Sequence, residues 1–305
     1  LQNNGLNPDT NKRCEFSLDI TCTTGLSCPF LSCIDGGSDQ IIAKNIVEVA
    51  TYKDLVKFPE AHGYTFGKDL FLLGYDWRLS LGYYQSINQS PLPKKLRGMI
   101  EDVAPECQDK VNIIAHSLGG LLLRSYLEWC QKNGMDHNID TAIYLGTPHK
   151  GVPKAYGVLK WAHSLLPFLY SLPVYGLNRH TMSFIAQNFP SAYQLLPRYN
   201  FIEEKNGKLE DFKESFLNLS NQTLVTMARE FYESIKNYNP VERSFAINGS
   251  GQLTPLQYKV RQGDCIEVIP DPTGDGTVPM FSSSTFTGTK TSFVNGKHSD
   301  LPEIP

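Results

Sequence analysis

The stretch that decides the fold is Val111-Asn-Ile-Ile-Ala-His-Ser-Leu-Gly-Gly120. Its first five residues are mostly apolar and predict a buried strand, and the apolar residues over 118–130 predict a helix that begins immediately after Ser117. A tight turn from strand to helix requires small residues two positions before and after its central residue, because larger side chains would collide there. Ala115 and Gly119 meet this requirement. The stretch therefore predicts a nucleophile elbow that lifts the hydroxyl of Ser117 above a sheet.

The helix after Ser117 bears directly on the chemistry of this turn. The N–H of Leu118 and the positive end of the helix would face the oxygen anion that forms when the serine attacks an ester carbonyl. A serine in this place could also do no more than cap the helix. The strand before it and the apolar helix after it favour Ser117 as a nucleophile and Leu118 as a backbone oxyanion donor.

A candidate acid lies in a glycine-rich loop near the end of the chain. A serine hydroxyl needs a base that an acid orients, and after a nucleophile elbow the partners follow in the chain order serine, acid, histidine. Gly274 and Gly276 flank Asp275 and allow a loop to present its carboxylate after a strand. Asp264 and Asp271 are the competing acids. We predict that Asp275 is the catalytic acid.

The order of the chain also selects the base, because His298 is the histidine that follows the acid. Its imidazole would take the proton from Ser117 and return it to the leaving alcohol. His116 lies inside the elbow, and we expect its side chain to point away from the serine. His149 follows another strand, and we expect it to shape the substrate pocket. The remaining histidines precede the acid: His62, His137, His163 and His180.

Strand and helix patterns alternate from about residue 45 to residue 147. Apolar runs at 69–75, 111–115 and 141–145 predict buried strands, with helical spacing between them. This alternation is typical of a parallel sheet with helices on both faces. Together with the elbow it predicts an α/β fold of the α/β-hydrolase type.

A different kind of segment interrupts this alternation. Residues 152–242 are rich in aromatic residues, proline and leucine, and strand signals return at 244–247 and 291–294. We therefore predict a hydrolase core formed by 1–151 and 243–305, of which 1–44 are irregular and rich in cysteine. We predict that 152–242 form an inserted cap over the sheet.

The composition excludes some classes of function. The chain has 305 residues, is 41% hydrophobic and 19% charged, and carries a formal net charge of −3. Such a charge gives no polycationic surface, so we expect no nucleic-acid partner. The sequence also contains no uninterrupted run of the roughly 18 apolar residues that a membrane-spanning helix needs.

The seven cysteines are many for a cytosolic enzyme of this size. Four of them fall within a short N-terminal stretch: Cys14, Cys22, Cys28 and Cys33. A zinc site is one interpretation, but no CxxC pair or neighbouring histidine supports it. Disulfides fit better and imply an oxidising compartment. Potential glycosylation sequons agree with this: Asn88, Asn218, Asn221 and Asn248.

We predict one specific disulfide, between Cys107 and Cys130. The strand from Val111 to His116 and the helix from Leu118 to Cys130 each span about 20 Å, given ~3.3 Å per strand residue and ~1.5 Å per helical residue. The elbow reverses the chain between them, so the end of the helix should return close to Cys107. Such a bridge would stabilise the fold by ~3 kcal/mol and brace the strand, elbow and helix that hold Ser117.

Five stretches together resemble the lecithin:cholesterol acyltransferase family, which includes lysosomal phospholipase A2 and the phospholipid:diacylglycerol acyltransferases. They are Gly74-Tyr-Asp-Trp-Arg78, Ala115-His-Ser-Leu-Gly-Gly120, Leu145-Gly-Thr-Pro-His149, Ser191-Ala-Tyr-Gln-Leu-Leu-Pro197 and Gly274-Asp-Gly-Thr-Val-Pro279. Their order and spacing cover about residues 45–300, and the first and last stretches discriminate most.

The resemblance implies an acyl–enzyme on Ser117, formed from a glycerophospholipid ester and passed to water or to a lipid alcohol. It implies no cofactor and no metal, transient contact with a membrane or lipoprotein surface, and a secreted protein or one in the lysosomal or vacuolar lumen. Tyr75, Trp77 and His149 would line the substrate pocket. A cap that binds acyl chains would use the following aromatic and leucine residues: Trp161, Leu165, Leu166, Phe168, Leu169, Tyr170 and Phe184.

The chain departs from the family at the second oxyanion donor. The family places this donor after an earlier strand that ends in Pro-Gly, and no such stretch is present. One interpretation is that the chain is incomplete at its N-terminus, because residues 7–11 resemble the segment that follows the family's lid. The other is that 29–34 form a substitute strand and that Gly36 or Gly37 supplies the donor.

Two rival functions remain on the sequence alone. The first is a general carboxylesterase of the same fold that acts on small esters. The second is a catalytically impaired homologue that binds lipid without turning it over. The long aromatic segment at 152–242 and the stretch at 74–78 favour the lipid acyl hydrolase or acyltransferase over the first rival. Labelling with a fluorophosphonate probe would decide the second, because only an activated serine reacts.

Overall fold

The structure of the protein is a computed structural model. It describes residues 50–82, 92–104, 110–161, 179–203, 209–210, 221–236, 241–262, 264–284 and 288–303. The chain forms two compact units. The first comprises residues 1–76 with 302–305, and the second comprises residues 77–301.

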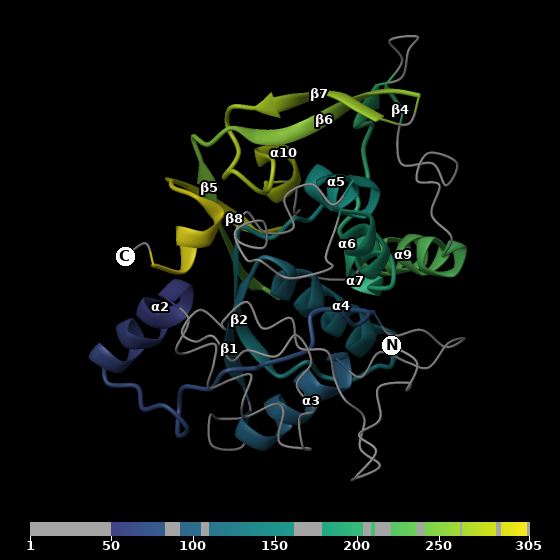
Figure 1. The fold of residues 1–305 in the computed structure, drawn as a ribbon. Coiled ribbons are helices and arrows are strands. Elements are labelled where there is room, and N and C mark those ends of the chain that lie inside the picture. The colour runs from purple at the N-terminus through teal and green to yellow at the C-terminus, as the bar shows by residue number, and fades with distance from the viewer. Residues whose placement is uncertain are drawn as a thin grey trace, which may run out of the picture. The chain divides into compact units, whose positions relative to one another are not determined.

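A four-stranded parallel sheet organises the second unit (Figure 1). Its strands run in the order β1 (Val111–His116), β2 (Ile139–Leu145), β5 (Arg243–Ser250) and β8 (Lys290–Asn295). Each neighbouring pair is parallel. Since parallel strands end at a common edge, residues that follow β1, β2, β5 and β8 meet at the carboxyl end of the sheet, where ligands bind in open α/β folds.

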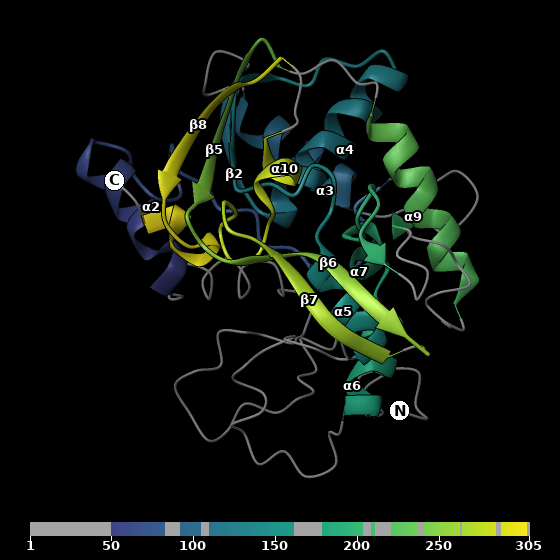
Figure 2. The same ribbon diagram turned by 90° about the horizontal axis from the view of Figure 1, so that it is seen from above.

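Helices of the second unit pack against this sheet and against one another. The apolar helix α4 (Leu118–Lys132) contacts β1, α3 (Leu92–Val103) and α9 (Gln222–Ile235). In Figure 2 these three helices lie on the same side of the parallel sheet. The inner face of α4 is almost fully buried, with Leu121, Leu123 and Tyr126 exposed by no more than 1%. This helix therefore fixes the elbow to the core.

A second sheet has the strand order β4 (Leu209–Glu210), β3 (Ile202–Glu203), β6 (Thr254–Arg261) and β7 (Asp264–Asp271). Strands β6 and β7 form an antiparallel pair, and β3 joins β6 in parallel. Between β2 and β3 the chain forms the helices α5 (Pro153–Trp161), α6 (Arg179–Ala186) and α7 (Pro190–Gln194). Aromatic rings of Tyr156, Phe201 and Tyr258 pack together between α5 and this sheet. The assignment of 152–242 to a cap stays a prediction.

The remaining elements are short or lie in the first unit. The first unit contains α2 (Ala50–Ala61). After β7 comes the single-turn helix α10 (Met280–Ser283), and a 3₁₀ helix, η2, follows β8 at His298–Glu303.

The prediction from the sequence was wrong for two parts of this architecture. Residues 69–75 were predicted to form a buried strand, but the structure shows irregular backbone with one isolated bridge, between Phe66 and Leu70. An apolar run becomes a strand only where a neighbour completes its hydrogen bonds, and no ladder partner for it lies in the described part of the chain. Conversely, the β6–β7 pair was not predicted.

The structure also corrects two chemical predictions. Cys130 is a buried free thiol, which contradicts the predicted disulfide to Cys107. Cys107 itself lies outside the described residues. Asn248 is exposed by only 1% on β5, which excludes this sequon as a surface glycosylation site. The side chain of Asn221 instead caps α9 by accepting from the N–H of Leu224 at 3.3 Å.

Several other predictions fall outside the described residues. These are the cysteine-rich segment, including Gly36 and Gly37, the sequons at Asn88 and Asn218, and residues 165–170 of the proposed acyl-chain site. Within the described ranges, no helix combines the length and the apolar character that crossing a bilayer requires.

Candidate active site

The elbow between β1 and α4 has the backbone that its sequence predicts. Ser117 adopts φ 54° and ψ −120°, a conformation that residues other than glycine rarely occupy. Its N–H donates to the carbonyl of Leu145 at 2.9 Å, which anchors the turn to the end of β2. Ala115 is buried, and the adjoining Gly120 approaches Thr147 so closely that a Cβ there would lie 1.9 Å from its Oγ1. A side chain at position 120 would therefore collide with Thr147.

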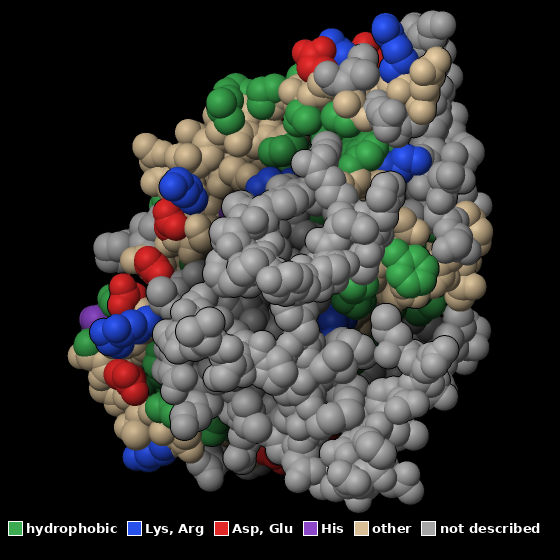
Figure 3. Space-filling model, viewed as in Figure 1, with side chains coloured by type: hydrophobic (Ala, Val, Ile, Leu, Met, Phe, Trp, Pro, Cys, Tyr) green, Lys and Arg blue, Asp and Glu red, His purple; other side chains and the backbone are tan. Residues whose placement is uncertain are grey.

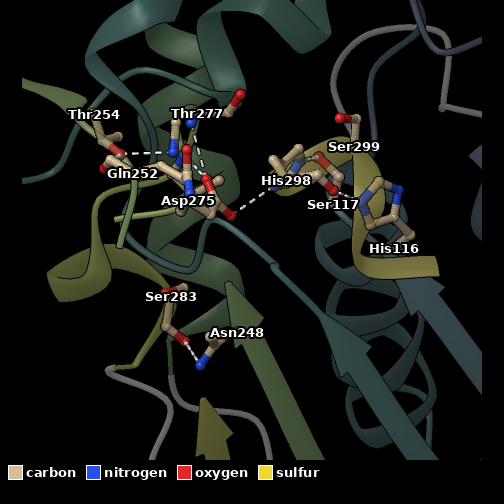
Figure 4. A network of polar contacts seen from close by, with 12 residues as sticks. His116, Ser117, Asn248, Gln252, Thr254, Asp275, Thr277, Ser283, His298 and Ser299 are labelled. Carbon is tan, nitrogen blue, oxygen red and sulfur yellow. Dashed lines mark hydrogen bonds and ion pairs between the residues drawn. The ribbon is translucent and has the colours of Figure 1, made fainter. Parts of the chain in front are cut away.

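Ser117, His298 and Asp275 form one hydrogen-bonded chain (Figure 4). The Nε2 of His298 lies 2.8 Å from the Oγ of Ser117, and its Nδ1 lies 2.8 Å from the Oδ2 of Asp275. The carboxylate accepts from Nδ1–H, so Nε2 is left as the acceptor of the serine proton. The side chain of Asp275 is exposed by 1% and that of His298 by 13%, so the chain runs from the interior to an accessible end.

The backbone around Asp275 holds its carboxylate. Oδ1 accepts from the N–H of Thr277 at 2.9 Å and of Val278 at 2.6 Å, which leaves Oδ2 for His298. The carbonyl of Asp275 also accepts from the backbone N–H of His298 at 2.8 Å. Two groups of Asp275 therefore orient the base, one through the side chain and one through the main chain.

The competing acids do not have this arrangement. Asp271 is spent on its own loop, where it accepts from the N–H of Thr273 at 2.8 Å and of Met280 at 3.1 Å. The side chain of Asp264 is outside the described part of the structure.

Glycines let the three strand ends approach one another. At the end of β2, a Cβ on Gly146 would lie 3.0 Å from the Nδ1 of His298. In β5, a Cβ on Gly249 would lie 2.7 Å from the Cβ of Asp275. A Cβ on Gly274 would lie 2.3 Å from the Oγ1 of Thr254. The same Oγ1 accepts a hydrogen bond from the N–H of Gly276 at 2.7 Å. At these three positions only a glycine leaves room for the groups around Ser117, His298 and Asp275, which are called the triad below.

Comparison with known proteins then decides the family. The model of the family described as lecithin:cholesterol acyltransferase matches residues 34–305. The chain belongs to the lecithin:cholesterol acyltransferase family. Over 226 residues it is 27% identical to the lysosomal phospholipase A and acyltransferase of Bos taurus, which covers 72% of this chain and 54% of that protein.

A second member of the lecithin:cholesterol acyltransferase family is similarly distant. Over 206 residues the chain is 26% identical to the phosphatidylcholine-sterol acyltransferase of Mus musculus, covering 65% of this chain and 44% of that protein. The chain thus spans about half the length of the curated relatives it matches. Among solved structures, a chain of the Tle4–Tli4 complex has a TM-score of 0.52 at 14% identity and covers 76% of this chain and 65% of that chain. The fold is that of the α/β-hydrolases.

Further predicted site residues are Leu118, Trp77 and Tyr75, and their contacts do not test the roles predicted for them. Leu118 begins α4, so its N–H belongs to the helix end that has no intrahelical acceptor. Trp77 is partly buried and packs edge-on against Phe189, with ring centroids 5.5 Å apart. Tyr75 belongs to the first unit, where burial, followed by the neighbouring Tyr52, raises the pKa of its phenol.

His149 has the contacts of a core residue. It is exposed by 4% and packs against the ring of Tyr144. Arg124 donates to the carbonyl of His149 at 3.4 Å and to that of Ile235, the last residue of α9, at 3.0 Å. Burial, followed by the charge of Arg124, holds the pKa of His149 well below its usual value. These contacts join α4 to the β2 end and to α9, and none of them involves the triad.

Two residues near the triad were missed. The Nζ of Lys154, on α5, donates to the Oγ1 of Thr277 at 3.2 Å, and burial lowers its pKa against the opposing charge of Asp275. His116 was expected only to point away from the serine, and its contact with the base was not predicted: its Nε2 lies 3.0 Å from the carbonyl oxygen of His298. Sequence spacing carries no signal for this contact, because the two residues are separated by 182 positions.

Proposed function

We propose that this protein is a serine-dependent acyl hydrolase or O-acyltransferase that acts on glycerophospholipid esters. The observation that carries the proposal is the hydrogen-bonded chain from Ser117 through His298 to the buried Asp275. Family membership supports the substrate class, since the relatives described above are named for phospholipase A and acyltransferase activity.

In the first half-reaction, the Oγ of Ser117 attacks the ester carbonyl carbon while its proton moves to Nε2 of His298. Asp275 accepts from Nδ1–H and stabilises the imidazolium that forms. The oxyanion of the tetrahedral intermediate receives the N–H of Leu118 at the N-terminus of α4. The bond to the leaving alkoxide then breaks, and His298 returns the proton to that oxygen, which releases a lysophospholipid and leaves an acyl ester on Ser117.

In the second half-reaction, an acceptor hydroxyl replaces the lysophospholipid. His298 takes the acceptor's proton as its oxygen bonds to the acyl carbon, and Ser117 Oγ leaves and recovers a proton. Water as acceptor gives a free fatty acid, and a lipid alcohol gives a new ester. The same three side chains serve both outcomes, so the acceptor determines the reaction.

Exposed apolar side chains support contact with a lipid surface. In Figure 3 hydrophobic side chains gather over β6 and β7, near the top of the view. Leu253, just before β6, is exposed by 72%, and Val268, in β7, is exposed by 41%. Phe281 on α10 is exposed by 45%. α10 begins at Met280, three residues after Thr277 of the loop that carries Asp275. Such a surface suits transient binding to a membrane or lipoprotein.

The residues at 152–242 would supply a cap over the acyl chain. Phe184 on α6 is exposed by 63%, and Trp161 closes α5 with its ring 5.2 Å from that of Tyr156. A secreted or lysosomal setting for the protein is inferred from the relatives, one of which is named as lysosomal.

The test is product analysis on phosphatidylcholine liposomes, with and without ceramide, sterol or diacylglycerol. We expect lysophospholipid together with free fatty acid or with a new ester of the added alcohol, and no product from Ser117→Ala. Turnover of p-nitrophenyl acetate but not palmitate, with intact phosphatidylcholine, would instead support the small-ester carboxylesterase. No product on any ester would support the lipid-binding homologue.

A further inference from the structure

The ring of His116 touches the triad base from the side opposite its acid. The Nε2 of His116 lies 3.0 Å from the carbonyl oxygen of His298, and the two ring centroids are 4.9 Å apart with the planes tilted by 34°. Figure 4 shows His116 beside His298, next to Ser117 and away from Asp275. The residue before the nucleophile therefore contacts the residue that activates it.

The hydrogen bond requires a proton on Nε2 of His116, because a carbonyl oxygen can only accept. Burial, followed by the nearby His298, lowers the pKa of His116 to about 4, against the smaller raising effects of the hydrogen bond to His298 and of the charge on Asp275. The ring is therefore neutral near neutral pH, with Nε2–H as donor. A neutral neighbour adds no second positive charge when His298 takes the serine proton.

The contact completes a two-sided hold on the backbone of His298. The N–H of His298 donates to the carbonyl of Asp275 at 2.8 Å, and its own carbonyl accepts from His116. His298 is the first residue of η2, directly after the loop that follows β8. Without the second bond, the carbonyl of His298 would lose its hydrogen bond to the elbow, and the imidazole could drift relative to the Oγ of Ser117.

We propose that His116 is a positioning residue of the acyl-transfer site, which uses its Nε2–H to register the main chain of the triad base against the nucleophile elbow. The proposal rests on the proposed role of Ser117 as nucleophile. It adds a fourth side chain to the site, one that acts through His298 and does not touch the substrate.

Three variants separate a donor from a space-filling ring. In His116→Gln, the side-chain amide can place an N–H where Nε2–H stands. His116→Phe keeps the ring and removes the donor. His116→Asn retains a donor that is too short to reach, so it repeats the comparison if the Phe variant does not fold. Circular dichroism verifies the fold of each variant before its activity is compared.

The readouts are the second-order rate at which an alkyl fluorophosphonate labels Ser117, and kcat and KM on p-nitrophenyl butyrate. We expect the Phe and Asn variants to label and turn over on the order of 10–100-fold more slowly with an unchanged KM, and the Gln variant to stay within roughly threefold of the native protein. Native rates in folded Phe and Asn variants, or a Gln variant as slow as they are, would overturn the proposal. A native protein that is not labelled would refute the role of Ser117 instead.

Discussion

Gly249 and Asp275 are packed so closely that a Cβ on the glycine would lie 2.7 Å from the Cβ of the aspartate. The same Cβ would lie 2.8 Å from the carbonyl oxygen of Gly296, two residues before His298. Gly249→Ala should therefore displace both the acid and the loop that carries the base. We expect kcat/KM on p-nitrophenyl butyrate to fall by up to ~10²-fold.

The matched control is Gly98→Ala on α3, where a Cβ would meet nothing within 4 Å. Alanine is favoured over glycine inside a helix, so this variant should keep full activity and gain up to about 1 kcal/mol of stability. Equal activity of the two variants would show that the contact between β5 and the acid loop has no bearing on the triad.

The hydrogen bonds of Asp275 make a specific prediction for Asp275→Asn. An asparagine can still accept from the N–H of Thr277 and Val278 through its oxygen, so the loop should keep its shape. Its amide nitrogen would then face Nδ1 of His298 and favour the tautomer that carries its proton on Nε2, which cannot accept from Ser117. We expect kcat to drop on the order of 10³–10⁴-fold with little change in thermal stability. Retained activity would move the acid to another residue.

Cys130 gives a test of the corrected disulfide. Burial raises the pKa of its thiol, with opposing hydrogen bonds from Tyr126 and Arg97, and the residue is exposed by 1%. Both effects should protect it from iodoacetamide in the folded protein, whereas Cys265 is partly exposed and should react sooner. Peptide mapping by mass spectrometry after labelling in native buffer and in denaturant measures this. A peptide linking Cys130 to Cys107 would restore the disulfide predicted from the sequence.

The low pKa of His116 predicts how stability responds to acid. An unfolded histidine has a pKa near ~6.5 and the folded residue one of about 4, so the unfolded chain binds more protons between these values. This histidine therefore destabilises the fold as the pH falls from about 7 to about 5. His116→Gln removes the titration, and the loss of unfolding free energy between these pH values should shrink by about 1–2 kcal/mol. Urea unfolding of both proteins measures it, and an identical loss would contradict the low pKa.

The sequence could predict that Ser117, Asp275 and His298 lie together because each of them follows from a local rule. Small residues around Ser117 and the glycines around Asp275 mark tight turns, and chain order then selects His298. The structure adds that Ser117 and His298 follow β1 and β8 of the parallel sheet, whereas the loop of Asp275 follows β7 of the second sheet and packs against Gly249 of β5.

The features that the sequence missed depend on contacts between distant segments. The contact of His116 with His298 and that of Lys154 with Thr277 join residues more than a hundred positions apart, so no periodicity reports them. The predicted bridge of Cys130 failed because strand and helix lengths fix how far the chain returns, but not the direction in which a side chain points. Cys130 instead packs inward beside Tyr126.

The central claim is that Ser117 forms an acyl–enzyme with a phospholipid acyl chain. It is tested most directly by mixing the native protein with dioleoyl phosphatidylcholine vesicles, quenching in acid and mapping peptides by mass spectrometry. We predict one oleoyl adduct, on the peptide that contains Ser117, and none in Ser117→Ala. Lysophospholipid release without any adduct on Ser117, or an adduct on another residue that persists in Ser117→Ala, would contradict it.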